Sequence, residues 1–302
     1  MDRFDAIRTL LAAVDGGSLS AASRKLRMPL PTVSRKVSEL ERHLGTQLVV
    51  RTSRKLLLTD AGRAFVGSAR VVLDMLDDAE RAAAGEYRVP QGNLLVTASI
   101  MFGKLHVAPI AIDFLAAYPQ IHLKLVLADH VIDLVEHHVD AAVRIGQLPD
   151  SALLATHLGD ILWVTCASPA YLARRGMPAS PADLPNHACI AFEGLEPARD
   201  WRFGTGAGGQ TITISPRYSV STAESVIDAA VAGVGICRVT SYQADDALRS
   251  GKLIRVLDGH SPDPVPIHLV HAGQALIPLK LRAFLDFAKP LLKARIANIA
   301  AS

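Results

Sequence analysis

The sequence predicts an α/β protein in which a small helical domain and one long helix precede a larger domain of alternating strands and helices. Apolar residues at three- and four-residue spacing occupy the first 45 residues, which is typical of packed amphipathic helices. A stretch without proline runs from residue 60 to 89, and extended and helical segments alternate from residue 93 onward. With 302 residues and 50% hydrophobic content, the chain can bury more than one core.

Two short helices are predicted at the N-terminus. Apolar residues recur along one face of residues 4–14, and this first helix is expected to end at Gly16. Either Ser18 or Ser20 can cap a second helix that continues to Leu26, because both hydroxyls precede the next apolar run. The small side chains within this second segment suit a close crossing of two helices.

A third helix is predicted from Pro31, whose missing N–H costs nothing in a first turn, to Gly45. Its expected buried stripe consists of Val33, Val37, Leu40 and Leu44. The opposite face carries side chains that hydrogen-bond bases and phosphates, namely Thr32, Ser34, Arg35, Ser38 and Arg42. The pattern therefore predicts a helix suited to the major groove of DNA.

A basic β-hairpin is expected directly after this helix. Two extended runs at 47–50 and 55–58 are separated by Arg51-Thr52-Ser53-Arg54. Beside a recognition helix, such a hairpin is placed to contact the flanking backbone or the minor groove, as the wing of a winged helix-turn-helix does. A three-helix bundle that does not contact DNA is the alternative interpretation.

Charge is distributed unevenly along the chain. The first 60 residues contain eleven basic and six acidic residues, a net charge of +5, whereas the whole chain has a net charge of +3. The remainder therefore carries a net charge of −2. The first 60 residues, here called the head, are basic, whereas the rest of the chain is slightly acidic. This asymmetry indicates that only the head binds a polyanion, and a merely solvated charged surface is the alternative.

One long helix is predicted after the hairpin. Thr59 can cap a helix that begins at Asp60 and has no proline until Pro90, long enough for seven or eight turns. Near-heptad apolar spacing is provided by Phe65, Ala69, Val72, Met75 or Leu76, Ala79 and Ala82. Such a stripe favours pairing with a partner helix, and packing on its own chain is the alternative.

The C-terminal two thirds alternate between strand and helix. Strands are expected at 94–98, 121–127, 140–145, 161–165, 235–239 and 267–270, and helices at 103–117, 131–137, 221–232 and 279–293. This alternation predicts a parallel α/β sheet in each of two lobes, with the chain crossing between them twice. Ligands of open α/β sheets bind beyond the carboxyl ends of strands, where helix N-termini offer unpaired N–H groups.

Several ordered motifs resemble the LysR family of bacterial transcription regulators. The head matches at GSLSAASRKL (17–26), PTVSRKV (31–37) and LTDAG (58–62), and the larger domain at FGKLH (102–106), DAAVRIG (140–146) and AGVGI (232–236). The resemblance implies a winged helix-turn-helix at 1–59, a linker and dimerisation helix at 60–89, and a periplasmic-binding-protein-like effector domain at 90–300. Lobe I would comprise 90–160 and 266–295, and lobe II 161–265.

The resemblance also implies a regulator that binds an operator on double-stranded DNA as a dimer or a tetramer. The expected DNA-binding residues are Ser20, Leu30, Pro31, Thr32, Ser34, Arg35, Ser38, Arg51 and Arg54. Two stretches depart from the family pattern: Pro29-Leu30 replaces the usual Ser-Gln, and Arg238-Val239-Thr240 stands where a proline is usual. Leu30 is therefore expected to pack on a thymine methyl group rather than to hydrogen-bond a base.

The family resemblance implies a small-molecule effector, a small organic acid or an aromatic metabolite, between the lobes. The expected contacts are Ser99, Met101, Phe102, Asp129, Gly146, Phe203, Ser221 and Thr222. Ser99, Ser221 and Thr222 could hold a carboxylate at a helix start, or could be ordinary caps. Phe102 and Phe203 could wall the cleft, or belong to the core.

Other classes of protein have weaker support in the sequence. No GxSxG, HExxH or GxxxxGK motif occurs, and His130, His137 and His138 are expected to be solvated, so we predict no enzyme, cofactor or metal site. The three cysteines form no CxxC pair and are expected to be buried, with redox sensing as the alternative. Without an export signal or a run of about 20 apolar residues, a cytoplasmic protein is expected rather than a solute receptor or membrane protein.

Overall fold

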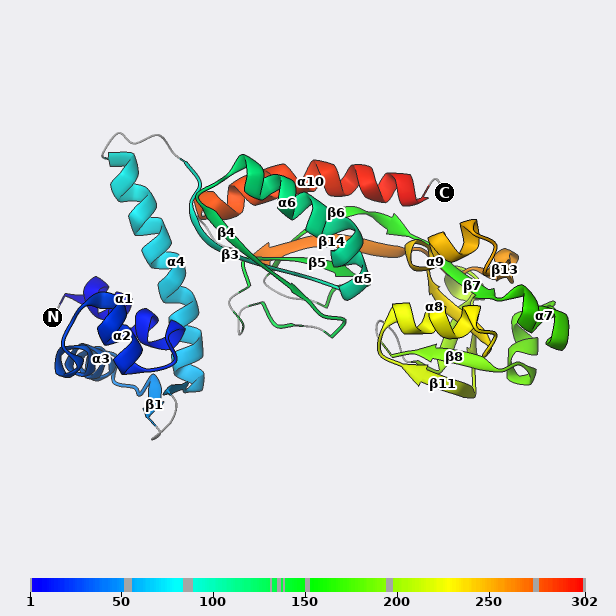
Figure 1. Cartoon of the computed structure of the whole chain (residues 1–302), viewed down its shortest axis with the longest axis horizontal. Helices are drawn as coiled ribbons and strands as arrows, with labels where there is room; N and C mark the ends of the chain where they lie inside the picture. Colours follow the sequence, from blue (N-terminus) through cyan, green and yellow to red (C-terminus); the bar gives the residue numbers. More distant parts are fainter. Residues whose placement is uncertain are drawn as a thin grey trace. The chain divides into compact units, whose positions relative to one another are not determined.

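The computed structural model describes residues 2–51, 56–83, 89–130, 132–134, 137, 139–149, 153–193, 198–273 and 277–300. It divides into two compact units (Figure 1). The first comprises residues 1–90 with 133–139 and 274–282, and the second comprises residues 91–132, 140–273 and 283–302.

Three helices form the head, as predicted: α1 (Arg3–Asp15), α2 (Leu19–Leu26) and α3 (Leu30–Leu44). Ser18 rather than Ser20 caps α2, since its Oγ accepts a hydrogen bond from the Ala21 amide at 3.1 Å. Gly45 ends α3 with a φ of +67°, a left-handed conformation that favours glycine. Val33, Val37 and Leu40 are buried as expected. The prediction for Leu44 is wrong, because this last helical residue lies beyond the core and is exposed.

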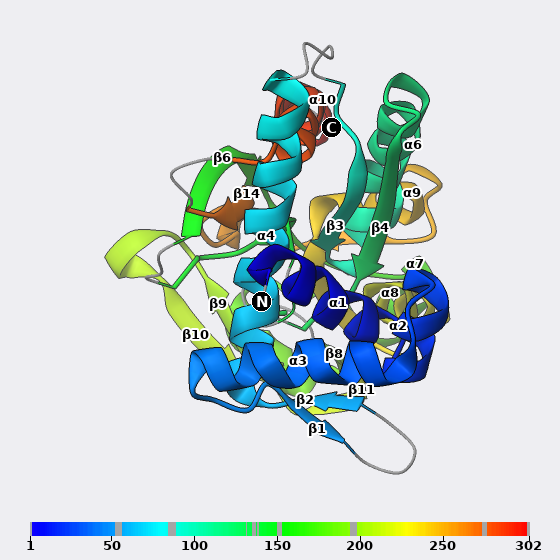
Figure 2. The ribbon, with the colours of Figure 1, turned by 90° about the vertical axis from the view of Figure 1, so that its left-hand side faces the viewer.

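The expected hairpin follows as β1 (Val49–Arg51) and β2 (Leu56–Leu58), which pair antiparallel with Val49 opposite Leu58. Its tip, with Arg54, lies outside the described residues. Figure 2 shows the hairpin alongside α3.

The long helix α4 (Asp60–Ala83) begins at the predicted cap, where the Gly62 amide donates to Thr59 Oγ1 at 2.9 Å. Its buried stripe agrees with the prediction at Ala69 and is shifted by one residue on either side of it. Val66, Ala69 and Leu73 are buried, whereas Val72 is 47% exposed. Val66 belongs to the same apolar cluster as Ala6 and Leu10 of α1, so the head itself covers this face of the helix.

The first sheet of the second unit has the strand order β4-β3-β5-β14-β6. Its strands are β3 (Gly92–Ala98), β4 (Ile121–Leu127), β5 (Ala141–Ile145), β6 (Leu153–Ile161) and β14 (Val265–Ala272). The expectation of a purely parallel sheet is wrong, because β14 runs antiparallel to both β5 and β6. β6 carries the chain out to the second lobe and β14 brings it back, so these two neighbouring strands run in opposite directions.

Residues 100–117 form one helical run beside this sheet, made of α5 (Ile100–Phe102), the π-helical turn η1 (Gly103–Val107) and α6 (Ala108–Ala117). The run begins three residues before the predicted start. By length and composition it is a candidate membrane span, but its side chains at 102, 110 and 114 are fully buried in the lobe. Phe114 contacts Phe284 and Phe287 of α10 (Leu279–Ala300) at ring distances of 5.3 and 5.5 Å, with the two helices side by side in Figures 1 and 2.

The second sheet has the order β11-β8-β12-β7-β13 and is also mixed. Its strands are β7 (Trp163–Ala167), β8 (Cys189–Phe192), β11 (Pro216–Val220), β12 (Ile236–Thr240) and β13 (Ile254–Val256). Its helices are α7 (Pro169–Arg175), η2 (Pro181–Asn186), α8 (Ala223–Val231), α9 (Ser241–Arg249) and η4 (Asp258–His260). A separate hairpin consists of β9 (Asp200–Phe203), η3 (Gly206–Gly208) and β10 (Gln210–Thr213). Of the helix expected at 131–137, the described residues 132–134 and 137 are not helical, and the others lie outside the described part.

Candidate functional site

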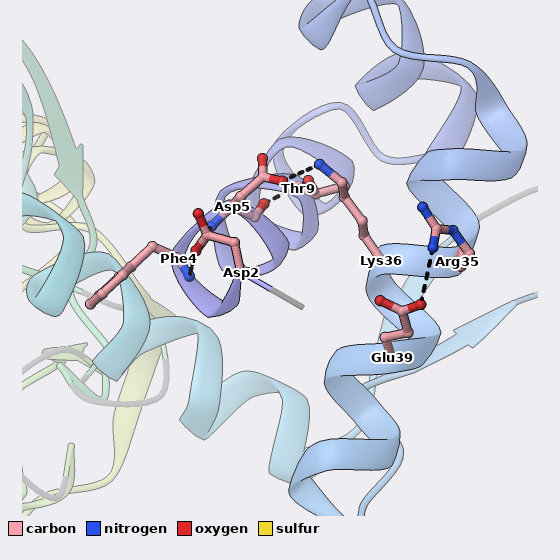
Figure 3. Close-up of polar contacts among 7 residues, drawn as sticks. All are labelled: Asp2, Phe4, Asp5, Thr9, Arg35, Lys36 and Glu39. Atoms are coloured by element: carbon pink, nitrogen blue, oxygen red, sulfur yellow. Dashed lines mark hydrogen bonds and ion pairs between the residues drawn. The ribbon is translucent and has the colours of Figure 1, made fainter.

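Helix α3 carries most of the predicted DNA-binding residues. Leu30, the first helical residue, is 43% exposed, and the Arg35 side chain is 67% exposed. Arg35 Nη1 lies 3.4 Å from Glu39 Oε1 one turn later (Figure 3). An exposed i,i+4 pair contributes little to stability, so this contact is easily exchanged for another anion.

Four of the remaining predicted residues also lie on α3, and three lie elsewhere in the chain. Pro31 is exposed, whereas Thr32, Ser34 and Ser38 are half-buried on the same helix. Ser20 is exposed on α2. Arg51 ends β1, and Arg54 lies outside the described residues.

Lys36 of α3 connects this helix to α1 and does not belong to the exposed face. Its Nζ forms an ion pair with the Asp5 carboxylate, and its side chain is only 18% exposed (Figure 3). The backbone carbonyl of Asp5 accepts a hydrogen bond from Thr9 Oγ1 at 2.7 Å, and Asp2 caps the same helix through the Phe4 amide at 3.0 Å. Since Lys36 joins α3 to α1, it fixes the orientation of the helix whose outer face is offered to a ligand.

Glu41 connects α3 to the hairpin, a role that the sequence analysis did not identify. Its Oε1 accepts hydrogen bonds from the Leu48 amide at 2.8 Å and the Val49 amide at 3.0 Å. Both donating residues are fully buried, so the carboxylate satisfies two donors at the start of β1. The signal available in the sequence was an acidic residue next to the buried position Leu40.

Two ion pairs link α1 to the long helix within the first unit. Arg8 Nη2 lies 2.5 Å from Asp77 Oδ1, and Arg70 pairs with Asp15. Near the start of α4, Gly62 approaches Leu48 so closely that a Cβ atom would lie 2.0 Å from the Leu48 carbonyl oxygen. The head therefore rests on this helix through close backbone contact as well as through charge.

In the second unit, Ser99 and Asp129 meet at the start of the helical run 100–117. Asp129 Oδ1 accepts a hydrogen bond from the Ile100 amide at 2.9 Å, whereas Ser99 makes no capping bond with its side chain. Burial raises the pKa of Asp129, and the bond from Ile100 opposes that shift. The Ile100 amide, which was expected to be available to a ligand, therefore already donates to the carboxylate of Asp129.

Tyr242 lies close to Ser99, although nothing in the sequence singled it out. Its ring packs edge-on to Phe102 at 5.4 Å, and its hydroxyl accepts a hydrogen bond from Gln243 Nε2 at 3.3 Å. Burial raises the pKa of Tyr242, and the nearby hydroxyls of Thr240 and Ser99 oppose that rise. These groups form a polar cluster where α5 of one lobe meets α9 of the other.

The other predicted effector residues are less clearly placed for a ligand. Phe102 and Phe203 are core residues and not cleft walls, because their side chains are fully buried. Thr222 is the cap of α8, accepting from the Ser225 amide, while Ser221 is exposed beside it. Met101 is half-buried, and Gly146, with a φ of +109°, has open space around its α-carbon.

Arg238, in the second stretch that departs from the family pattern, is almost completely buried. Its guanidinium carbon lies 4.7 Å from the Trp163 ring centre, 5.6 Å from that of Phe203 and 5.9 Å from that of Trp201. Its Nη1 also donates to the Arg202 carbonyl at 2.5 Å. Cation–π contacts and hydrogen bonding therefore stabilise this arginine inside lobe II.

Two family descriptions together match most of the chain. Residues 4–63 match the bacterial regulatory helix-turn-helix proteins of the lysR family, and residues 88–293 match the LysR substrate binding domain. The chain belongs to the LysR family of transcription regulators. Its first unit thus contains the family's DNA-binding helix-turn-helix, and its second contains the effector-binding domain.

Relatives in the LysR family match over nearly the whole chain. The regulator CrgA of Neisseria meningitidis is 35% identical over 282 residues, covering 93% of this chain and 94% of CrgA. The repressor PA14_22550 of Pseudomonas aeruginosa is 34% identical over 295 residues, covering 96% and 92%. The solved structure of CrgA has a TM-score of 0.61 with 34% identity, covering 95% of this chain and 98% of that one. Full-length AphB of Vibrio cholerae has a TM-score of 0.60 with 28% identity, covering 94% and 97%.

Within the part of this LysR-type regulator that the structure describes, no three His, Cys, Asp or Glu side chains are grouped closely enough to hold a metal ion. Cys166, Cys189 and Cys237 are buried free thiols.

Proposed function

We propose that this LysR-type regulator binds its operator through α3 and the β1–β2 hairpin, and that a small molecule between the lobes modulates the binding. The observation that carries the proposal is the exposed N-terminal face of α3, with Leu30 and Arg35 outward, on a head with a net charge of +5. Arg35 would contact a guanine or a phosphate, and Leu30 a thymine methyl group. Ser20, Thr32, Ser34 and Ser38, with Arg51 and Arg54 of the hairpin, would complete the interface.

For the effector we propose a small organic acid or an aromatic metabolite bound near Ser99 and Thr222. Because Asp129 already accepts from the Ile100 amide, an acid would be held by hydroxyl groups rather than by this helix terminus. Binding would favour one arrangement of the two lobes, and α4 would transmit that choice to the spacing of two heads. The proposed role is regulatory, cytoplasmic and non-enzymatic.

We further propose that the protein forms a dimer through α4 and that two dimers pair into a tetramer. Val66 packs against the head, while Val72 remains exposed on another face of the helix. A partner's α4 would bury that face. Light scattering of the purified chain at micromolar concentration tests this, and a monomeric mass would contradict it.

The DNA-binding proposal is tested by fluorescence anisotropy with duplex DNA from the intergenic region beside the protein's own gene. We expect an affinity that falls steeply between 50 and 200 mM salt, roughly 10³-fold for about six phosphate contacts. Arg35→Gln should weaken binding about tenfold or more, because a base or phosphate contact is lost. Arg217→Gln removes an exposed arginine from lobe II and should bind like the wild type. Absence of salt-sensitive affinity for any duplex would refute the proposal.

Two further measurements test the finer parts. Selection from random DNA should yield different preferences for wild type and Leu30→Gln, and identical preferences would rule out the thymine contact. A ligand that binds the effector domain should change the DNase footprint or the DNA bend, and an unchanged footprint at saturation would rule out the coupling.

A further inference from the structure

The long helix α4 is joined to the first turn of α10 by an ion pair. Lys280 Nζ lies 2.6 Å from Asp74 Oδ2, and both residues belong to the first compact unit. The Lys280 side chain is only 10% exposed, and the Asp74 side chain is 39% exposed. Removing one partner of so buried a pair leaves an uncompensated charge, which is far less favourable than breaking an exposed pair. The pair is therefore a firm contact between the two helices.

Apolar residues next to the pair are buried as well. Leu73, which precedes Asp74, is 7% exposed, and Leu281, which follows Lys280, is 6% exposed. The pair thus lies at the edge of a packed surface and not in open solvent. Reduced contact with water strengthens the attraction between the two charges.

Helix α10 continues from this contact into the effector-binding domain. Its residues 279–282 belong to the first unit, and the rest of the helix belongs to the second. In the second unit Phe284 packs on Phe114 of α6 at a ring distance of 5.3 Å. Ile296 Cγ2 lies so close to Gly159 of β6 that a Cβ atom on the glycine would be 2.7 Å away. Because one helix carries all these contacts, the position of its first turn depends on the domain in which the helix is buried.

The same turn of α4 is also bound by the head. Asp77, three residues after Asp74, has its Oδ1 2.5 Å from Arg8 Nη2 of α1. Residues three apart are neighbours on the surface of a helix. One turn of α4 therefore binds the DNA-binding head through one carboxylate and α10 through another.

The ion pair with Lys280 and the proposed dimer contact use different sides of α4. Successive residues of an α-helix are rotated by about 100° around the helix axis. Relative to the buried Leu73, Asp74 is therefore rotated about 100° to one side and the exposed Val72 about 100° to the other. The head, α10 and a partner's α4 can thus contact three different sides of the same helix.

We propose that the Lys280–Asp74 pair is a clamp that holds α4 in one direction relative to α10. With the clamp closed, the effector-binding domain determines where the head on α4 points. In a dimer, two clamped helices hold the two heads at one separation, so the protein selects one spacing of half-sites on DNA. The consequence for DNA rests on the proposed function, whereas the clamp itself can be tested without DNA.

Pulsed EPR on the full-length protein tests the clamp. Spin labels at Glu80→Cys on α4 and Arg282→Cys on α10 occupy two exposed positions, while the three native cysteines are buried. We expect a narrow distance distribution in this labelled parent protein and a distribution at least about twice as wide after Lys280→Met, which keeps a long side chain without its charge. Lys289→Gln is the matched control, because it removes a positive charge from an exposed position of the same helix, and it should keep the narrow distribution.

A charge exchange separates loss of the ion pair from loss of folding. The protein with both Asp74→Lys and Lys280→Glu can form the pair in reverse, so it should regain the narrow distribution, whereas Asp74→Lys alone should not. Equal widths in the parent and Lys280→Met proteins, whether narrow or broad, would overturn the inference. A double variant that stays as broad as Lys280→Met would overturn it as well.

Fluorescence anisotropy with three duplexes tests the consequence for DNA. The first is the bound intergenic sequence, the second has about five base pairs, half a helical turn, inserted between its half-sites, and the third contains one half-site. We expect the insertion to weaken wild-type binding about tenfold or more and Lys280→Met binding less than about threefold, with equal affinities of both proteins for the single half-site.

The two possible failures have different signatures. An equal loss on insertion for wild type and Lys280→Met would overturn the role of the clamp in selecting the spacing. A wild-type protein that binds two half-sites no better than one would instead contradict the proposed dimer, and the EPR comparison would then still decide whether the clamp exists.

Discussion

The Asp129 carboxylate accepts a hydrogen bond from the Ile100 amide across 2.9 Å, so a residue that follows β4 caps the helical run that follows β3. The two elements belong to neighbouring parallel strands, and this bond joins their carboxyl ends. An acceptor at a helix start satisfies an amide that has no partner within the helix. Burial raises the pKa of Asp129, which means that burial disfavours its charged form. The contribution of Asp129 to stability therefore comes from its hydrogen-bond acceptor and not from its negative charge.

We therefore predict different outcomes for two substitutions of Asp129. Asp129→Ala removes the acceptor and should lower the free energy of unfolding by about 1 kcal/mol, the usual effect of losing a cap. Asp129→Asn keeps an acceptor oxygen without the charge, so it should stay within about 0.5 kcal/mol of the wild type at pH 7. Urea unfolding measures both, and equal losses for the two variants would contradict the interpretation.

The raised pKa of Asp129 also predicts how the free energy of unfolding depends on pH. Because the native pKa lies above the unfolded value, the native state takes up the proton first as the pH falls. This residue therefore adds stability as the pH falls toward its unfolded pKa, and that increment should be missing in Asp129→Asn.

Glu41 should be more important for stability than its neighbour Glu39. Replacing Glu41 by alanine leaves the buried Leu48 and Val49 amides without their acceptor, which should cost about 2 kcal/mol and weaken DNA binding by displacing the hairpin. Glu39→Ala removes only the exposed pair with Arg35 and should cost less than about 0.5 kcal/mol. Urea unfolding with matched anisotropy titrations compares them. A Glu41→Ala protein as stable as Glu39→Ala would show that other groups hold β1 in place.

Periodicity in the sequence predicted the elements whose environment is local. The three head helices, the stop at Gly45 and the hairpin all depend on side chains within a few residues of one another. The register of α4 could not be obtained in this way, because α1 selects Val66 as the inward residue. A heptad pattern in one chain cannot tell whether its own head or a partner covers a given face.

The candidate effector region was predicted only in part for the same reason. Ser99 and Asp129 lie together at the ends of β3 and β4, since parallel strands bring their carboxyl ends to one edge, and their contact with an effector stays a prediction. Tyr242, however, comes from the other lobe and meets Ser99 only through the tertiary fold. The mixed sheets escaped prediction because the antiparallel direction of β14 follows from the path of the chain between the lobes and not from its own residues.

The three cysteines should be unreactive in the native protein. Burial raises the pKa of Cys189 to about 12, and the pKa of Cys237 is raised by its contact with Cys166, whose Sγ lies 3.4 Å away, and by burial. At pH 8 a thiol with a pKa near 12 is ionised in only about one molecule in 10⁴, and the thiolate is the reactive form.

We expect excess DTNB to label no thiol within minutes in the native protein and all three cysteines at once in guanidinium. Peroxide treatment should accordingly leave DNA affinity unchanged. Rapid native labelling of one thiol, together with a peroxide effect on DNA binding, would instead favour redox sensing.

His106 should make the protein less stable in mild acid. The pKa of His106 is lowered to about 4 by burial and by Arg295, whereas an unfolded histidine titrates near 6.5. As the pH falls from 7 toward 4, the unfolded state therefore takes up a proton that the native ring refuses, and the free energy of unfolding decreases. His106→Gln loses some packing at every pH but should show a smaller decrease between pH 7 and pH 5. Leu105→Ala, in the same π-helical turn, removes apolar contacts without a titrating group and should keep the wild-type decrease, so a His106→Gln protein with that same decrease would contradict the assignment.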